Sequence, residues 1–207
     1  AALLAKRLRY PAVAYTEGLT NWARSFARFA MAYPWMADKV KDPAVKKKTV
    51  VIGNLMLDAI KLQYSKEQMK KMMGNEKAPG LLLLPGSRPA HFQYMLAFYV
   101  KTVEKIKAQI PTLATAVSVS PFVTEEQLKA AFSGWGAREW GLSATYLPSG
   151  EQTIGVDGSL KVLGVIKTGT GVSIPCFHHQ QYDLMNWAEL ALTIPGTNTV
   201  ELASMGV

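Results

Sequence analysis

Four consecutive leucines, followed by a tight loop and a long helical pattern, constrain the fold of this chain most strongly. Leu81–Leu84 offers no polar position, so it is expected as a strand buried on both faces. The loop Pro85–Arg88 follows, and Pro89 suits the first turn of a helix. Apolar residues recur on one face of this helix as far as about Gln109. A buried strand that leads through a short loop into a helix predicts a parallel sheet.

Further strands and helices are expected to alternate along the rest of the chain. Strands are predicted at Leu113–Val119 and Glu189–Ile194, and helices at 124–132, 178–187 and 199–205. The pair Asp157-Gly158 is a turn signal that predicts a hairpin between 153–156 and 160–166. The alternation indicates an α/β domain whose sheet is Rossmann-like and largely parallel.

The residues before position 81 carry weaker patterns. Short strands are predicted at Tyr10–Tyr15 and Thr49–Ile52. Residues 63–80 are polar, rich in lysine and end in Ala-Pro-Gly, which is typical of a linker. The predicted division is an N-terminal domain at 1–62, a linker at 63–80 and a second domain at 81–207.

A helix is also predicted at Thr20–Tyr33. It would place Trp22 and Phe26 on one stripe and Arg24 and Arg28 on a neighbouring face. Basic residues beside aromatic ones on an amphipathic helix are typical of contact with a membrane surface. Packing of the stripe into a core is the alternative explanation.

Composition and charge restrict the class of protein. Hydrophobic residues make up 49% of the chain and charged residues 18%, as in a globular protein. The single cysteine excludes a disulfide within the chain and suits a reducing compartment such as the cytoplasm. No stretch reaches the roughly 18–20 apolar residues of a membrane-spanning helix. The net charge of +8 accompanies no nucleic-acid-binding motif, so a nucleic-acid partner is not expected.

The loop Pro85–Arg88 has the parts of a phosphate-binding site. Gly86 allows a ligand to approach the backbone closely, and the following helix offers free N–H groups and the positive end of its dipole. Ser87 can donate its hydroxyl, and Arg88 presents two parallel donors to phosphate oxygens. The alternative is structural: a turn at Gly86, a helix cap at Ser87 and a solvated Arg88.

A second loop, Pro195–Asn198, repeats this arrangement before the last predicted helix. Gly196, Thr197 and the helix N-terminus form an anion site, and Glu201 lies where a carboxylate can accept hydrogen bonds from paired sugar hydroxyls. The alternative is a capping box, with Asn198 as N-cap and Glu201 three residues later.

Other candidates have less support. His91 lies close enough to Arg88 to reach a substrate. Cys176 is more simply a buried thiol than a nucleophile. His178 and His179 are adjacent and project differently, with no third ligand spaced to join them, so no metal site is expected.

Three segments resemble the family of lipid A disaccharide synthases and their related proteins. Leu83–Arg88 is similar to the family's LLPGSR signature, and Ile194–Glu201 to its SGTATLE segment. Val51–Asp58 resembles the VGHPLxD segment near the domain hinge, and more closely the GNPMMD form of the related proteins. The segments occur in the family's order.

The resemblance implies a GT-B glycosyltransferase of bacterial lipid A biosynthesis. Such an enzyme transfers a hexosamine-type sugar from a UDP-sugar to a lipid-linked or glycolipid acceptor, at the cytoplasmic face of the inner membrane, without a metal or other cofactor. Residues at the matching positions would contact the donor: Gly86, Ser87, Arg88, Gly196, Thr197 and Thr199 at the phosphates, and Glu201 at the ribose or sugar hydroxyls.

The resemblance has departures and leaves other functions open. Asn54 and Leu55 replace the family's histidine and proline, and Pro195 and Asn198 replace a serine and an alanine. The chain starts at an alanine and stops directly after a helical pattern, so both domains are expected to be incomplete, the catalytic base to lie elsewhere and this piece to be inactive alone. The alternatives are another GT-B enzyme, such as a UDP-sugar 2-epimerase, and a non-catalytic nucleotide-sugar-binding protein.

Overall fold

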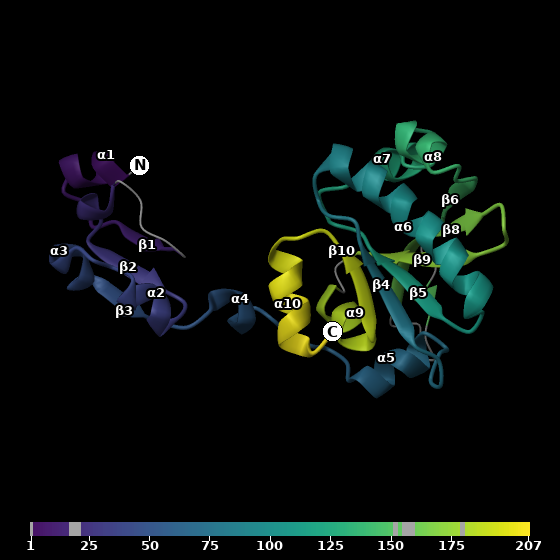
Figure 1. Ribbon diagram of the computed structural model, residues 1–207, viewed down its shortest axis with the longest axis horizontal. Helices are drawn as coiled ribbons and strands as arrows, with labels where there is room; N and C mark the ends of the chain where they lie inside the picture. Colours follow the sequence, from purple (N-terminus) through teal and green to yellow (C-terminus); the bar gives the residue numbers. More distant parts are fainter. Residues whose placement is uncertain (1, 17–21, 151–152, 155–159, 179–180) are drawn as a thin grey trace. The chain divides into compact units, whose positions relative to one another are not determined.

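The chain forms two compact units in the computed structural model, which describes residues 2–16, 22–150, 153–154, 160–178 and 181–207. The first unit comprises Ala1–Ile60 and the second Lys61–Val207. Each contains a sheet with parallel strands and flanking helices (Figure 1). The predicted α/β fold with Rossmann-like parallel sheets is confirmed.

The first unit is built on three parallel strands in the order β1 (Val13–Tyr15), β2 (Arg28–Met31) and β3 (Thr49–Val51). Its helical segments are α1 (Ala2–Arg7), η1 (Ala23–Ser25), α2 (Pro34–Asp38), α3 (Pro43–Lys46) and α4 (Leu55–Asp58). Its core contains Phe29, Met31, Met36, Val40 and Val45.

The helix predicted at Thr20–Tyr33 is wrong where the structure describes it. Only η1 is helical there, and β2 follows it as the central strand. Phe29–Met31 is buried throughout, as in a strand covered on both faces. Such a strand has no polar face, so its apolar residues also fitted the spacing of a helix. Arg24 instead pairs with Asp42, with 3.1 Å between Nε and Oδ2. The amphipathic helix that suggested membrane contact is therefore absent from the described part of this segment.

The second unit contains a larger mixed sheet in the order β10-β4-β5-β9-β8-β6. Its parallel part consists of β10 (Leu190–Thr193), β4 (Gly80–Leu84), β5 (Ala114–Ser118) and β9 (Ser173–Phe177). Its antiparallel edge consists of β8 (Leu160–Thr168) and β6 (Ala144–Pro148). The short β7 (Thr153–Ile154) pairs with β8 as the predicted hairpin requires, and the predicted turn at Asp157-Gly158 lies outside the described residues.

Helices cover both faces of this sheet, as Figure 1 shows around β4. Leu81 and Leu83 pack with α6 (Pro89–Gln109), α7 (Glu125–Ala130) and α8 (Trp135–Glu139). Leu82 and Leu84 pack on the opposite face, which is covered by α5 (Lys66–Met72), α9 (Gln181–Trp187) and α10 (Thr197–Met205). The four leucines therefore hold the two layers together.

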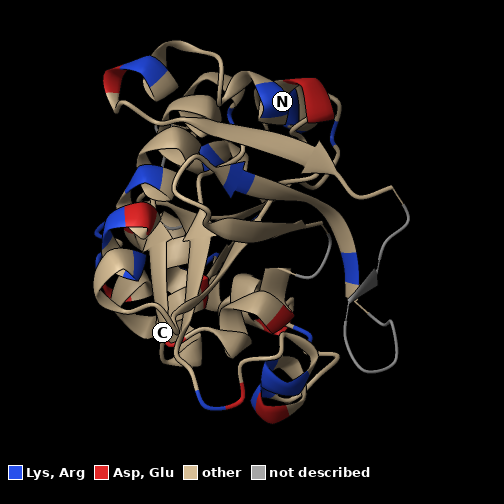
Figure 2. Ribbon diagram, turned by 90° about the vertical axis from the view of Figure 1, so that its right-hand side faces the viewer, with Lys and Arg blue, Asp and Glu red and all other residues tan. Residues whose placement is uncertain are grey.

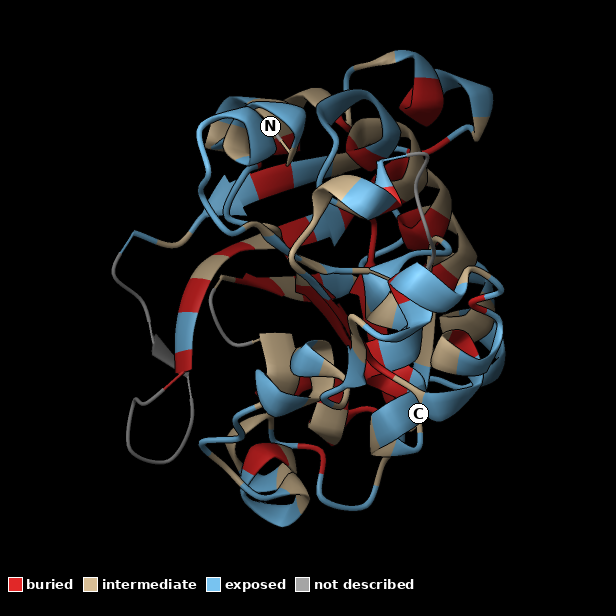
Figure 3. Ribbon diagram, turned by 90° about the vertical axis from the view of Figure 1, so that its left-hand side faces the viewer, coloured by how far each residue is buried: buried red, intermediate tan, exposed pale blue. Residues whose placement is uncertain are grey.

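Buried and charged residues are distributed as this layered arrangement requires. Buried residues concentrate in the strands (Figure 3), and charged residues lie mainly on helices and loops (Figure 2). None of the helices in the described ranges is long and apolar enough to cross a membrane.

Residues 63–80, predicted as a linker, are fastened to the second unit. The backbone N–H groups of Gln63 and Tyr64 donate to Oδ1 of Asp183 at 2.8 and 3.0 Å, and Asp183 is buried in α9. A capping box at Ser65 then starts α5, which packs against α9. Two of the lysines that suggested a solvated linker, Lys66 and Lys70, form ion pairs instead.

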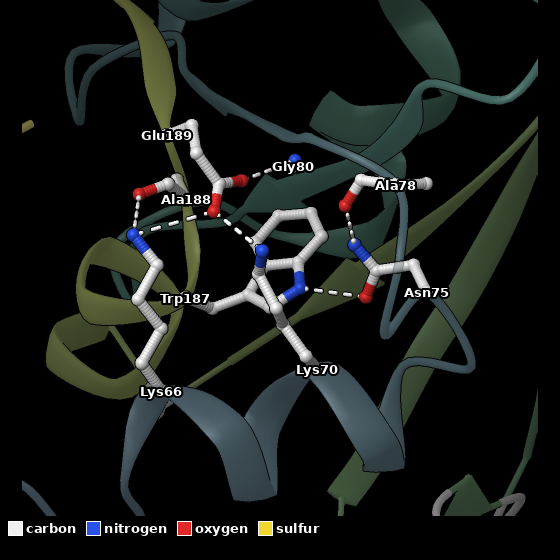
Figure 4. A network of polar contacts seen from close by, with 8 residues as sticks. All are labelled: Lys66, Lys70, Asn75, Ala78, Gly80, Trp187, Ala188 and Glu189. Atoms are coloured by element: carbon white, nitrogen blue, oxygen red, sulfur yellow. Dashed lines mark hydrogen bonds and ion pairs between the residues drawn. The ribbon is translucent and has the colours of Figure 1, made fainter.

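The partner of these lysines is Glu189, between α9 and β10 (Figure 4). Its carboxylate lies 2.6 Å from Nζ of Lys70 and 3.4 Å from Nζ of Lys66, and it accepts a 2.6 Å hydrogen bond from the Gly80 N–H. Nearby, the Trp187 indole donates to Asn75. We call Glu189, Lys66, Lys70 and the Gly80 N–H the α5 clasp, because together they fix α5 to the start of β4.

The α5 clasp makes the stability of the second unit depend on pH. Burial raises the pKa of Glu189, but the hydrogen bonds from Lys70 and Gly80 and the charge of Lys66 outweigh it, so the pKa lies below its ordinary value of 4.5. The carboxylate therefore stabilises the folded state above pH 4.5, and this contribution is lost as the pH falls through the lowered pKa.

Glu189→Gln is expected to reduce the free energy of unfolding at neutral pH by roughly 1.5–3 kcal/mol, the contribution of a hydrogen bond to a charged group. The difference from the parent protein should shrink as the pH falls below 4.5. Urea denaturation across this pH range measures both effects. Glu76→Gln, which removes the same charge from the exposed loop after α5, serves as control. A pH-independent difference would contradict the assignment.

Candidate functional site

The site lies where the direction of chain connection reverses in the larger sheet. From β4 the chain crosses through α6 to β5, on one side of β4, whereas α9 leads from β9 to β10 on its other side. β4 and β10 are neighbours and parallel, with Leu84 paired to Thr193 at their carboxyl ends. A crevice opens at such a switch point and is the usual ligand site of open α/β sheets.

Both predicted phosphate loops meet at this crevice. Pro85–Arg88 follows β4 and 194–196 follows β10, and a cavity of about 1050 Å³ lies between them. The cavity is lined by six of the seven residues predicted to bind the donor: Gly86, Ser87, Arg88, Gly196, Thr197 and Glu201. His91, in the first turn of α6, lines it as well.

Gly86 brings the two loops into contact. Its φ of +91° lies in the region that favours glycine, and a Cβ there would come within 2.7 Å of Cδ1 of Ile194. Ile194 stands at the start of the other loop. The positive φ and the close approach of Ile194 therefore both favour glycine at this position.

Arg88 occupies the N-cap position of α6, and Pro89 the first helical position. The alternative that Ser87 caps this helix is thus wrong. Arg88 is exposed at the cavity, and no described residue pairs with its guanidinium. The backbone N–H groups of Ala90 and His91 lie in the first turn, where a helix has no internal acceptor for them. Arg88, Ala90 and His91 border the same cavity, so the guanidinium and these N–H groups could serve one anion site.

The second helix starts earlier than predicted. Gly196 is the N-cap of α10, which begins at Thr197, so Asn198 lies inside the first turn. The alternative of an Asn198–Glu201 capping box is therefore wrong. The Gly196 N–H donates to Oγ1 of Thr199 at 3.3 Å, and the Thr199 N–H returns a 3.1 Å bond to the Gly196 carbonyl. Thr199 thus shapes the loop from within.

Glu201 is held at one end of the cavity by α9. It is buried, and its carboxylate accepts hydrogen bonds from the Tyr182 hydroxyl and from Nε2 of Gln181, both at 3.2 Å. Burial, and then the charge of Glu201 and the hydrogen bond to it, raise the pKa of Tyr182. A carboxylate fixed in this way can accept hydrogen bonds from ligand hydroxyls with little loss of side-chain entropy.

Sequence reasoning missed both Gln181 and Tyr182. They lie in the first turn of α9, close to Glu201 only in the folded unit. It also missed three aromatic residues at another part of the cavity wall, Tyr94, Phe122 and Trp135. The sequence signal that could have found Phe122 is its place in the loop after the strand predicted at Leu113–Val119.

Cys176 and His178, two of the remaining candidate residues from the sequence, are not among those that line the cavity. Cys176 is fully buried in β9, where burial raises the pKa of its thiol, so the interpretation as a buried thiol is confirmed. His178 is half-buried after β9, and His179 lies outside the described residues. In the described ranges, no three histidine, cysteine or acidic side chains gather as metal ligands would.

Comparison with known proteins confirms the family resemblance. Residues 42–133 match the family model described as lipid-A-disaccharide synthetase. The lipid-A-disaccharide synthase of Myxococcus xanthus (strain DK1622) is 26% identical over 110 residues, which are 53% of this chain and 28% of that protein. The chain thus corresponds to little more than a quarter of that relative's length. The family match includes the loop after β4 and ends before the loop after β10.

The contact between Gly86 and Ile194 can be tested with matched glycines. Gly171 has nearly the same φ, +87°, but no heavy atom within 4 Å of a built Cβ. Gly171→Ala should therefore cost only the backbone strain, roughly 1–3 kcal/mol of unfolding free energy. Gly86→Ala should cost about 1 kcal/mol more, because it also crowds Ile194. Chemical denaturation of both variants measures the difference, and equal losses would contradict the crowding.

Proposed function

We propose that the second unit binds the diphosphate of a UDP-sugar between the loops after β4 and β10. It would thereby serve as the donor-binding domain of a GT-B glycosyltransferase similar to lipid-A-disaccharide synthases. The observation that carries this proposal is the convergence of two glycine loops and two helix N-termini on one cavity at the switch point. The family match over residues 42–133 supports it.

The arrangement suits the departure of UDP from a sugar. Negative charge grows on the leaving diphosphate as the glycosidic bond breaks. The N-terminal amides of α6 and α10 are fixed before the reaction, and together with the guanidinium of Arg88 they would stabilise that charge. The proposed transfer uses no metal or other cofactor, because these groups supply the positive charge.

Glu201 takes the hydroxyl groups of the donor in this proposal. Its position beside the phosphate loops suits either the ribose or the transferred hexosamine-type sugar. We assign the first unit to the side of a lipid-linked acceptor, at the cytoplasmic face of the inner membrane, on the strength of the family resemblance. A non-catalytic protein with this site would bind the same donor without transfer.

The phosphate assignment predicts the behaviour of Arg88 variants in a UDP titration by calorimetry. Arg88→Ala should weaken UDP binding roughly 10- to 100-fold, because a hydrogen bond to a charged group contributes about 1.5–3 kcal/mol. Arg88→Lys should lie between, since it keeps the charge but loses the bidentate geometry. Arg138→Ala removes the same charge from α8, outside the cavity, and should leave the dissociation constant near that of the parent.

Two outcomes would contradict the proposal. One is a folded parent protein that fails to bind UDP. The other is UDP binding that Arg88→Ala and Arg138→Ala weaken equally, since this would indicate a general effect of charge instead of a contact.

Glu201→Gln tests the hydroxyl contact separately. The amide keeps the shape of the side chain but loses the charge that strengthens its hydrogen bonds. We expect binding of a UDP-sugar to weaken about tenfold and binding of pyrophosphate to stay unchanged. Competition titrations with UDP, a UDP-sugar and pyrophosphate separate the cases: loss for UDP and UDP-sugar assigns Glu201 to the ribose, and loss for UDP-sugar alone assigns it to the sugar. Unchanged binding of all three ligands would contradict the assignment of Glu201 to the donor hydroxyls.

A further inference from the structure

The cavity wall contributed by α6 and α8 carries aromatic side chains that the phosphate chemistry does not use. The rings of Tyr94 and Trp135 stack with centroids 5.0 Å apart and planes 19° apart, and both line the cavity. Phe122, after β5, lines it too. We call these three residues the aromatic wall.

The aromatic wall is rigidly backed. Behind Tyr94 lies Trp140, with ring centroids 5.7 Å apart, and behind Trp140 lies Phe98, at 4.8 Å. Gly136 lets α8 approach α6, since a Cβ there would lie 3.1 Å from Cα of Tyr94. Trp135 is therefore held against Tyr94 by the packing of the two helices.

The front of the wall is open to solvent. Trp135 is 63% exposed and Phe122 79% exposed. Covering such large apolar side chains is favourable, so a ligand that lies on them would gain binding energy. Large aromatic side chains exposed at the rim of a cavity are typical of a surface that a ligand covers. A stack that already has two parallel rings offers its outer indole face to a third flat ring.

The position of the wall relative to the phosphate loops limits which ring can lie there. Tyr94 is five residues beyond Pro89, or about 7.5 Å along the axis of α6, and helical side chains lean back toward the N-terminus. This separation suits a ring joined to a phosphate through one pentose. A hydrocarbon chain needs neither a flat surface nor a fixed distance from a phosphate.

We propose that the aromatic wall stacks the base of the nucleotide whose phosphates lie at Arg88 and Gly196. The inference rests on the proposed function, since it deepens the assignment of the same cavity. Because every base has a π face, the wall adds affinity without choosing among bases. It makes the cavity a nucleotide site instead of a general phosphate site.

The experiment compares UDP, pyrophosphate and octyl phosphate as ligands of the whole chain, measured by calorimetry. Trp135→Ala should weaken UDP binding about 5- to 100-fold, which corresponds to the roughly 1–3 kcal/mol of one base stack. Pyrophosphate should bind with an unchanged dissociation constant. Trp135→Phe should restore most of the UDP affinity, because it keeps an aromatic face and also guards against misfolding of the alanine variant. Trp35→Ala removes a similarly exposed tryptophan from the first unit and should change nothing.

The outcomes separate the stacking proposal from the proposed function. UDP binding that depends on Arg88 but not on Trp135 overturns the stacking proposal alone. Equal weakening of pyrophosphate, or of octyl phosphate, by Trp135→Ala also overturns it, because the wall would then support the loop or hold an apolar chain. A folded parent protein that binds neither UDP nor pyrophosphate overturns both proposals.

Discussion

The parallel pairing of β4 with β10 is the constraint on which the rest of the second unit depends. The leucines of β4 alternate between two hydrophobic clusters, so this strand joins the layer of α6–α8 to the layer of α5, α9 and α10. Because the chain leaves the two strands in opposite directions, their ends stay uncovered. The same arrangement that completes the core thus leaves a cavity with two helix N-termini at its edge.

Three parallel strands of the larger sheet, β4, β5 and β10, were predictable because their apolar runs are short and bounded by turn residues. The long helix after β4 was predictable for a similar reason, since its periodicity persists over many turns. The strands β6 and β9 were not predicted. The two loops proposed to bind phosphate were chosen from local chemistry, and the fold brings them to one cavity. The structure adds that Thr199 belongs to the loop's own hydrogen bonds and does not line the cavity.

The misjudged segments all depend on partners far away in the sequence. Phe29 and its neighbours have helical spacing but form a central strand, because pairing with β1 and β3 buries them. Lys66 and Lys70 resemble a solvated tract, but Glu189, more than a hundred residues later, is their partner. Tyr94 and Trp135 stack only because α8 packs on α6. Periodicity and composition describe only residues that are near one another in the sequence, so they cannot predict such contacts.

The contact between Gly86 and Ile194 has a consequence for how this family of sites can diverge. A side chain at Gly86 would meet the end of the Ile194 side chain, so the space at one loop depends on the residue at the other. A homologue with a side chain at the position of Gly86 would need a moved or smaller side chain at the position of Ile194 and a different backbone angle at the loop. The two positions lie 108 apart in the sequence, and a record of substitutions at both would show whether the two loops have changed together.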